Sequence, residues 1–262
     1  MMIILIYSLL TLLATTIGAI AGLGGGVIMK PFFDLLGIHS PSIIGIYSSM
    51  AVFTMCSVSI YKQIKNGVKI NKEVVLWVSL GSFIGGFFGE TIFHAIASNA
   101  QDIRVIKSIQ AFSLMMMLMG ILWYTKNQEK CQSYNISNPI MILIIGILLG
   151  SVSVFLGIGG GPLNVAVFTL FFSFALKDAM IASLATIFFA QVSKLGQVIF
   201  TQQYIGIDKN ILLFICIAAV LGGLLGTKIN RSQKENSIRH IYIYTLYFLI
   251  FLSFINGIKA FF

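Results

Sequence analysis

Charged residues are scarce in this chain. They make up 10% of its 262 residues, whereas an ordinary soluble domain holds roughly 25%. Hydrophobic residues reach 58%, and the mean hydropathy is +0.96. So few charges cannot cover a surface that faces water, which excludes a soluble globular protein. The composition instead predicts an integral membrane protein with the lipid bilayer around it.

Motifs of enzymes and of metal sites are also lacking. The chain contains no HExxH, GxSxG or GxxxxGK[ST] sequence, the patterns of metalloproteases, acyl transfer and ATP binding. Its cysteines, Cys56, Cys131 and Cys216, show neither CxxC spacing nor a paired histidine, so neither a zinc site nor a disulfide framework is indicated. We expect no enzyme, no catalytic residue, no metal and no cofactor.

Long apolar segments fill most of the chain. A helix needs about 20 apolar residues to cross a hydrocarbon core of about 30 Å. Runs of Leu, Ile, Phe, Gly and Ala supply them without the polar alternation of barrel strands. The expected fold class is therefore an all-α integral membrane protein. Its apolar segments are predicted near residues 3–36, 42–61, 74–97, 103–125, 139–176, 179–200, 210–229 and 239–261.

A polar stretch divides the chain almost in half. Residues 126–138 (KNQEKCQSYNISN) are predicted to be a linker. The sequences on either side, residues 1–125 and 139–262, are predicted to be two homologous transmembrane repeats of four segments each. GLGGG at 22–26 in the first repeat is matched by GIGGG at 157–161 in the second, at the corresponding position.

The first segment of each repeat is too long for a single crossing. Each must bend, re-enter or cross twice, and the break is predicted at the glycines because glycine weakens a helix by about 1 kcal/mol per residue. If the segment at 139–176 makes no net crossing, most lysines and arginines of the loops fall on one side. Cytoplasmic loops show this bias. It favours inverted repeats and explains the net charge of +9 without nucleic acid as a partner.

Two stretches resemble a known family. GAIAGLGGGVIMKP at 18–31 and GSVSVFLGIGGGPLNV at 150–165 are similar to the paired glycine-rich signatures of the TauE/SafE family of sulfite exporter-like permeases. The resemblance covers essentially the whole chain. It implies a multi-pass inner-membrane transporter that moves small sulfur-containing organic or inorganic anions. One departure is that Pro162 follows the second glycine run directly, whereas Pro31 lies five residues beyond Gly26.

The glycine breaks are candidates for the substrate site. A helix that resumes after a break presents free N–H groups and partial positive charge, which suit an anion. The alternative is that the glycines only permit close helix packing. The residues predicted to bind the substrate with their backbone are Gly24, Gly25, Gly26, Gly159, Gly160 and Gly161.

Polar side chains near the breaks are further candidates. Ser48, Ser183 and Thr186 offer hydroxyl donors, and Asn164 offers an amide. The alternative for the hydroxyls is hydrogen bonding within or between helices. Lys194 lies inside a segment, where it either contacts the anion or reaches the interface with its long stem.

An acidic residue and a histidine share one helix face in the third segment. Glu90 and His94 are four residues apart, a spacing that brings side chains together on a helix. They form either a proton-linked pair, because histidine titrates near neutral pH, or a pair at the membrane interface. The interfacial pair is the favoured interpretation.

Together these features indicate a secondary transporter of small anions that binds its substrate between the broken helices. The expected coupling ion is a proton or sodium, and the oligomeric state is open. A channel would show a continuous polar stripe, whereas only scattered hydroxyls and amides are present. A membrane-embedded assembly factor without transport turnover is the other alternative.

Overall fold

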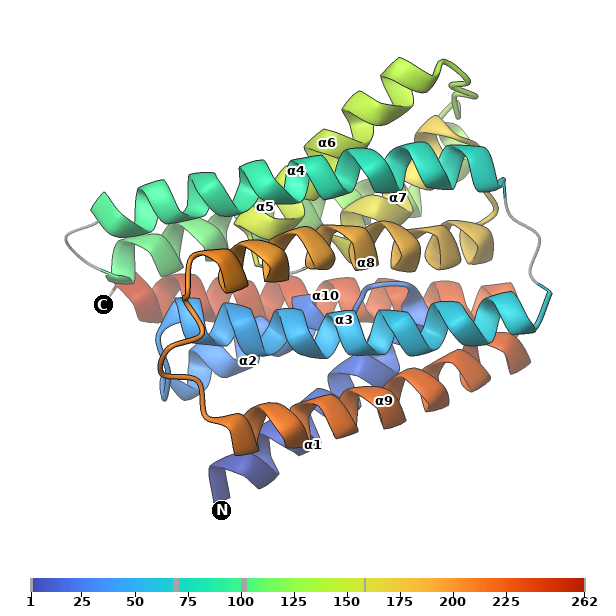
Figure 1. The fold of residues 1–262 in the computed structure, drawn as a ribbon. Coiled ribbons are helices and arrows are strands. Elements are labelled where there is room, and N and C mark those ends of the chain that lie inside the picture. Colours follow the sequence, from blue (N-terminus) through green and yellow to red (C-terminus); the bar gives the residue numbers. More distant parts are fainter. Residues whose placement is uncertain (1, 68–70, 100–102, 158, 262) are drawn as a thin grey trace.

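The structure of the protein is a computed structural model that describes residues 2–67, 71–99, 103–157 and 159–261. All regular elements in these residues are helical (Figure 1), which confirms the expected all-α class. The helices are α1 (Met2–Ala21), α2 (Gly26–Leu36), α3 (Pro41–Lys65), α4 (Lys72–Asn99), α5 (Ile103–Lys126), the 3₁₀ helix η1 (Gln128–Lys130), α6 (Pro139–Phe155), α7 (Gly161–Phe171), α8 (Leu176–Phe200), α9 (Lys209–Ser232) and α10 (Glu235–Phe261).

Seven helices of the described chain are long and apolar enough to cross a membrane, namely α1, α3, α4, α5, α8, α9 and α10. The helices α6 and α7 are apolar but shorter. Large apolar side chains such as Trp123, Leu221 and Phe251 are exposed on the bundle, as lipid contact requires. The chain is a multi-pass membrane protein.

Side-chain caps fix where two of the helices begin. The Asn138 side chain accepts a hydrogen bond from the Ile140 N–H at 2.9 Å, with Pro139 at the first helical position of α6. The Asp208 side chain accepts from the Asn210 N–H at 2.8 Å at the start of α9. Both residue types are preferred helix caps. Helix α6 therefore begins directly after residues 126–138, the predicted linker.

Each long segment is broken at its glycines, as predicted. In the first segment, α1 ends at Ala21 and α2 begins at Gly26. In the second segment, α6 ends at Phe155 and α7 begins at Gly161. The backbone angle φ lies between +67° and +78° at the glycines inside the breaks. L side chains rarely adopt such left-handed angles, so the breaks require glycine. These glycines are Gly22, Gly24, Gly25, Gly157, Gly159 and Gly160.

Both broken segments return to the end of the bundle from which they start. The Tyr134 N–H, ahead of α6, donates to the Leu170 carbonyl near the end of α7 at 2.7 Å. The segment at 139–176 therefore makes no net crossing. The Tyr7 ring of α1 stacks on the Phe33 ring of α2 with centroids 4.1 Å apart, so α2 runs back along α1 (Figure 1).

The bundle has two distinct ends. Helix α1 begins and helix α10 ends at one of them, which we call the terminal end (Figure 1). The segment between α5 and α6 lies at the other, which we call the linker end. The helices α2, α4 and α8 also end at the terminal end (Figure 1).

Helices α3 and α8 run in opposite directions. Helices α3 and α9 begin together at the terminal end, where the Asp208 N–H donates to the Tyr47 hydroxyl at 3.0 Å. Helix α8 ends there, shortly before α9 begins. Helices α3 and α8 are therefore antiparallel (Figure 1). The division into inverted repeats at the linker stays a prediction.

Glycines allow helices of the two halves to pack backbone to backbone. A Cβ atom placed on Gly85 of α4 would lie 2.0 Å from the Ile147 carbonyl oxygen of α6. One placed on Gly226 of α9 would lie 2.3 Å from the Thr16 carbonyl oxygen of α1. Such close approach is typical of helix pairs with small residues in membranes. Each half thus packs its first helix on the other half.

The α4–α6 contact gives a prediction about folding. Replacing Gly85 by alanine should lower the stability by about 1–3 kcal/mol, because the added methyl group overlaps the α6 backbone. Gly120 of α5 is the matched control, since a Cβ atom there meets nothing within 4 Å. Thermal unfolding of the purified variants in detergent measures the difference. An unchanged melting temperature for Gly85→Ala contradicts the packing described.

Candidate substrate site

The two glycine breaks meet in the middle of the bundle. A Cβ atom on Gly24 would lie 3.4 Å from Val52 Cγ1 and 3.0 Å from Ile187 Cδ1. One on Gly159 would lie 3.5 Å from Val52 Cγ1 and from Ile187 Cγ2. The same two side chains, one from α3 and one from α8, therefore face both breaks.

One hydroxyl group joins the two breaks. Ser183 Oγ donates to the Gly22 carbonyl at 2.8 Å and lies 3.4 Å from the Gly161 carbonyl oxygen. The backbones themselves touch, because a Cβ atom on Gly161 would lie 2.2 Å from the Leu23 carbonyl oxygen. The predicted glycine runs and Ser183 thus form one continuous structure.

Two amide side chains beside the breaks are incompletely paired. Asn164 and Gln191 are 1% and 2% exposed. Asn164 Oδ1 and Gln191 Oε1 have no hydrogen-bond partner among the described residues. A Cβ atom on Gly160 would lie 3.4 Å from Asn164 Oδ1. Buried polar atoms are normally paired, so these amides single out the breaks as a place for a polar ligand.

Two other predicted side chains flank the breaks. Ser48 is buried on α3, one turn before Val52. Thr186 is buried on α8 and donates to the Ala182 carbonyl of its own helix at 3.2 Å, which is the within-helix bonding considered as the alternative. Neither of the two cavities described next includes these residues, or the predicted glycines, in its lining.

A buried lysine closes the end of α6. Lys30 of α2 is 5% exposed, and its Nζ donates to the Leu156 carbonyl at 2.8 Å and to Gln110 Oε1 at 2.5 Å. Gln110 Nε2 donates to the Phe155 carbonyl at 2.6 Å. The last carbonyls of a helix have no partner within it. Here α2 and α5 provide their donors.

The corresponding end of α1 is closed differently. Its Ile20 carbonyl accepts from Asn230 Nδ2 of α9 at 2.5 Å. This donor is neutral, whereas Lys30 is a cation. The two breaks are therefore similar in shape but unequal in charge.

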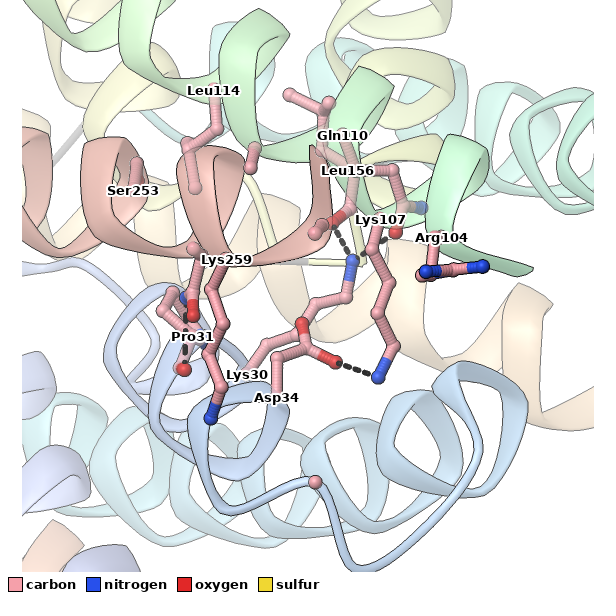
Figure 2. Close-up of a pocket in the computed structure, with 14 residues that line it drawn as sticks. Lys30, Pro31, Asp34, Arg104, Lys107, Gln110, Leu114, Leu156, Ser253 and Lys259 are labelled. Carbon is pink, nitrogen blue, oxygen red and sulfur yellow. Dashed lines mark hydrogen bonds and ion pairs between the residues drawn. The ribbon is translucent and has the colours of Figure 1, made fainter. Parts of the chain in front are cut away.

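Lys30 lies at a cavity of about 180 Å³ between α2, α5 and α10, which we call the basic pocket (Figure 2). Four of its described lining residues are basic: Lys30, Arg104, Lys107 and Lys259. Asp34 is the acidic one, and its Oδ1 lies 4.0 Å from Lys107 Nζ. The basic pocket therefore carries an excess of positive charge at the terminal end.

The loop charges contained a signal for this pocket. With no net crossing by α6 and α7, most basic residues fall at the linker end. The basic residues left at the terminal end are Lys30, Arg104, Lys107, Lys209 and Lys259, and all except Lys209 line the basic pocket. The many basic residues at the linker end indicated the orientation of the chain in the membrane, and the few at the terminal end indicated a cluster of positive charge that was not predicted.

A smaller cavity of about 10 Å³ lies next to the basic pocket and shares Lys30 and Gln110 with it. Glu90 and Lys194 also line it. Lys194 Nζ lies 3.5 Å from Glu90 Oε2, and the two side chains are 5% and 4% exposed. Lys194 is buried in an ion pair, so the alternative in which its stem reaches the interface is wrong. Its contact with an anion stays a prediction.

His94 completes this buried cluster. Its Nε2 lies 3.4 Å from Glu90 Oε1, with the His94 side chain 35% exposed. The predicted contact between Glu90 and His94 is present, with Glu90 buried and His94 partly exposed, and its position at the membrane interface stays a prediction. The i, i+4 spacing in the sequence predicted His94 as a partner of Glu90. The contact of Glu90 with Lys194 joins α4 to α8, so the spacing of residues along one helix could not predict it.

Polar residues connect the ion pair to the breaks. On α3, Ser48 stands between Gly45, whose Cβ position lies 3.3 Å from Lys194 Nζ, and Val52, which faces both breaks. On α8, Gln191 stands one turn from Lys194 on the side of the breaks. Residues three and four apart share a helix face. The basic pocket, the ion pair and the breaks thus form one series.

Comparison with known proteins identifies the family. The model of the family described as Sulfite exporter TauE/SafE matches residues 7–253. The chain belongs to the TauE/SafE family. It is also 26% identical, over 249 residues, to the Probable membrane transporter protein YunE of Bacillus subtilis (strain 168), with 87% of this chain and 89% of that protein covered. No solved structure matches the chain.

Membership of the TauE/SafE family makes the protein a membrane transporter and not an enzyme. The resemblance of the sequences at 18–31 and 150–165 to this family is confirmed. In the structure, both TauE/SafE signatures form the glycine breaks that meet at Ser183.

The double contact of Ser183 gives a prediction. Ser183→Ala should lower the free energy of unfolding by about 1–3 kcal/mol, because it leaves a buried carbonyl without its donor. Ser57→Ala is the control, since Ser57 donates to the Phe53 carbonyl of its own helix and its loss should cost no more than about 0.5 kcal/mol. Chemical denaturation in detergent compares the two, and equal effects contradict a joining role for Ser183.

Proposed function

We propose that this TauE/SafE protein is a secondary transporter, or permease, of small anions, with sulfur-containing oxyanions and organosulfonates as its substrate class. The basic pocket is the observation that carries the proposal. Its excess of cationic side chains attracts anions and raises their local concentration. The description of the family as sulfite exporters supports the sulfur chemistry.

The size of the basic pocket supports a small substrate. Its volume of about 180 Å³ is below the roughly 300–1,000 Å³ of pockets that hold drug-sized ligands. Ammonium and guanidinium groups form charge-assisted hydrogen bonds with oxyanions. Sulfite, thiosulfate and short sulfonates combine the required size with the required oxygen acceptors.

Lys30 is the side chain that we expect to hold the anion at the inner wall of the basic pocket. Its two hydrogen-bond acceptors, Gln110 Oε1 and the Leu156 carbonyl, are neutral. No carboxylate among the described residues lies within ion-pair distance of Lys30 Nζ. A buried charge without a counter-charge is costly. An anion would provide that counter-charge.

From Lys30 the anion would pass to an inner site at the glycine breaks. Helices α2 and α7 begin there, and the first N–H groups of a helix have no partner within it and suit an anion, although Pro162 of α7 has no N–H to offer. Both halves contribute to one place, so one anion would contact both. The residues of this inner site are Gly24, Gly25, Gly26, Gly159, Gly160, Gly161, Ser48, Ser183, Asn164, Thr186 and Lys194.

Alternating access would follow from rocking of the two halves around the inner site, as in transporters built from inverted repeats. The linker end carries most basic loop residues, so it would face the cytoplasm. The basic pocket would then open on the opposite side of the inner membrane.

The orientation can be tested with a native cysteine. Cys131 follows η1 at the linker end, and Lys209 begins α9 at the terminal end. A membrane-impermeant maleimide should label Lys209→Cys in intact cells and should label Cys131 only after permeabilisation. The variant Cys131→Ser is the control for background. Labelling of Cys131 in intact cells contradicts the orientation.

Loss of Lys30 should impair transport specifically. Uptake of labelled sulfite, thiosulfate, sulfonates and small carboxylates into proteoliposomes should saturate for the wild type. It should fall at least about tenfold for Lys30→Gln, which corresponds to about 1.4 kcal/mol. Lys209→Gln, an exposed lysine at the same end, is the matched control. Unsaturable flux would indicate a channel, and no flux of any anion would indicate an assembly factor.

A further inference from the structure

Glu90 is a buried acid at the inner side of the proposed anion entrance. Its Oε1 lies 3.4 Å from His94 Nε2, and its Oε2 lies 3.5 Å from Lys194 Nζ. Oε2 is buried and accepts no hydrogen bond from the described residues. An ionisable residue inside the membrane is costly and is typical of ion and proton pathways. Oε2 therefore faces Lys194 in an ion pair without a hydrogen bond, and a proton bound to Oε2 would take the place of that ion pair.

His94 links this acid to the terminal end of the bundle. The His94 side chain is 35% exposed, and its Nε2 lies 2.7 Å from Gln203 Oε1 in the turn after α8. Histidine gains and loses a proton near neutral pH. His94 thus connects Glu90 with the turn after α8 at the terminal end.

The groups that face Glu90 come from four helices. Helix α4 contributes His94, α8 contributes Lys194, and α2 and α5 contribute Lys30 and Gln110 to the same small cavity. With His94 neutral, the charges around this cavity are two lysines and one carboxylate. Asp34 lies in the basic pocket instead, where it faces Lys107.

The balance of these charges depends on the charge of the anion. The fully buried charges are those of Lys30, Lys194 and Glu90. The other basic residues of the basic pocket are partly or fully exposed, namely Arg104, Lys107 and Lys259. For the three buried groups, a singly charged anion at Lys30 gives a sum of zero, whereas a doubly charged anion leaves one negative charge in excess. Excess buried charge is unfavourable in a medium of low dielectric constant. One proton on Glu90 removes the excess. It also frees the ammonium group of Lys194 to face the second negative charge.

We infer that Glu90, served by His94, binds the proton that this transporter moves together with each doubly charged anion. This inference rests on the proposed anion transport. The proton enters from water at the terminal end and binds a carboxylate oxygen of Glu90. It leaves that oxygen when the site faces the other side, so that only an O–H bond forms and breaks. Protonation of Glu90 also weakens its contact with Lys194, which joins α4 to α8.

Two assays on reconstituted protein separate this inference from the proposed function. Labelled thiosulfate is the probe, because it stays doubly charged from mildly acidic to mildly alkaline pH. Exchange of external for internal thiosulfate without a pH gradient measures anion transport alone. Accumulation driven by acid outside the vesicles measures coupling to protons. The wild type should show both.

Glu90→Gln should keep exchange and should lose acid-driven accumulation at least about tenfold, because glutamine cannot carry the proton. Glu73→Gln is the matched control. Glu73 lies exposed in the first turn of the same helix, and its replacement should leave both activities at the wild-type level. Full acid-driven accumulation by Glu90→Gln overturns the inference. Absence of exchange in the wild type contradicts the transport proposal itself.

A second pair of variants covers the case in which Glu90→Gln does not fold. Glu90→Asp and Glu90→Asn shorten the side chain equally, but only aspartate can be protonated. Acid-driven accumulation should persist in Glu90→Asp and vanish in Glu90→Asn. Equal accumulation in both, or loss of exchange in both, assigns Glu90 to the fold or the anion path and overturns its role as the proton carrier.

Discussion

A backbone that stops being helical inside a membrane must find partners for its N–H and C=O groups, because lipid offers none. This constraint governs the structure. Both glycine breaks are placed against each other, Ser183 donates to their carbonyls, and Lys30 and Asn230 close the helix ends on either side. The long helices surround this centre, so that its irregular backbone is kept away from lipid.

The same constraint explains why the halves are interleaved. A short hairpin of broken helices cannot shield itself, so α6 lies along α4 and α1 lies along α9. Glycines at these contacts allow backbones to approach without side chains between them. The centre is thereby held by tight contacts, while the terminal end keeps room for the basic pocket between α2, α5 and α10.

Much of this fold was predictable from sequence, and much of the site was not. The all-α class and the breaks at 22–26 and 157–161 follow from composition and from the energetic cost of glycine in helices. The ion pair between Glu90 and Lys194 was missed because it joins two helices whose contact no local spacing encodes. Lys194 stands near a helix end in the sequence, which wrongly suggested that it reaches the interface.

The unequal closure of the two breaks has a consequence for energetics. In a molecule with true two-fold symmetry, the inward-facing and outward-facing states would be related by a two-fold rotation and equally populated. Here a cation closes α6 and an amide closes α1, so exchanging the roles of the halves moves a buried charge into a different environment. In the proposed alternating-access cycle, the empty protein would therefore have a preferred resting state, and substrate would provide the free energy that populates the other.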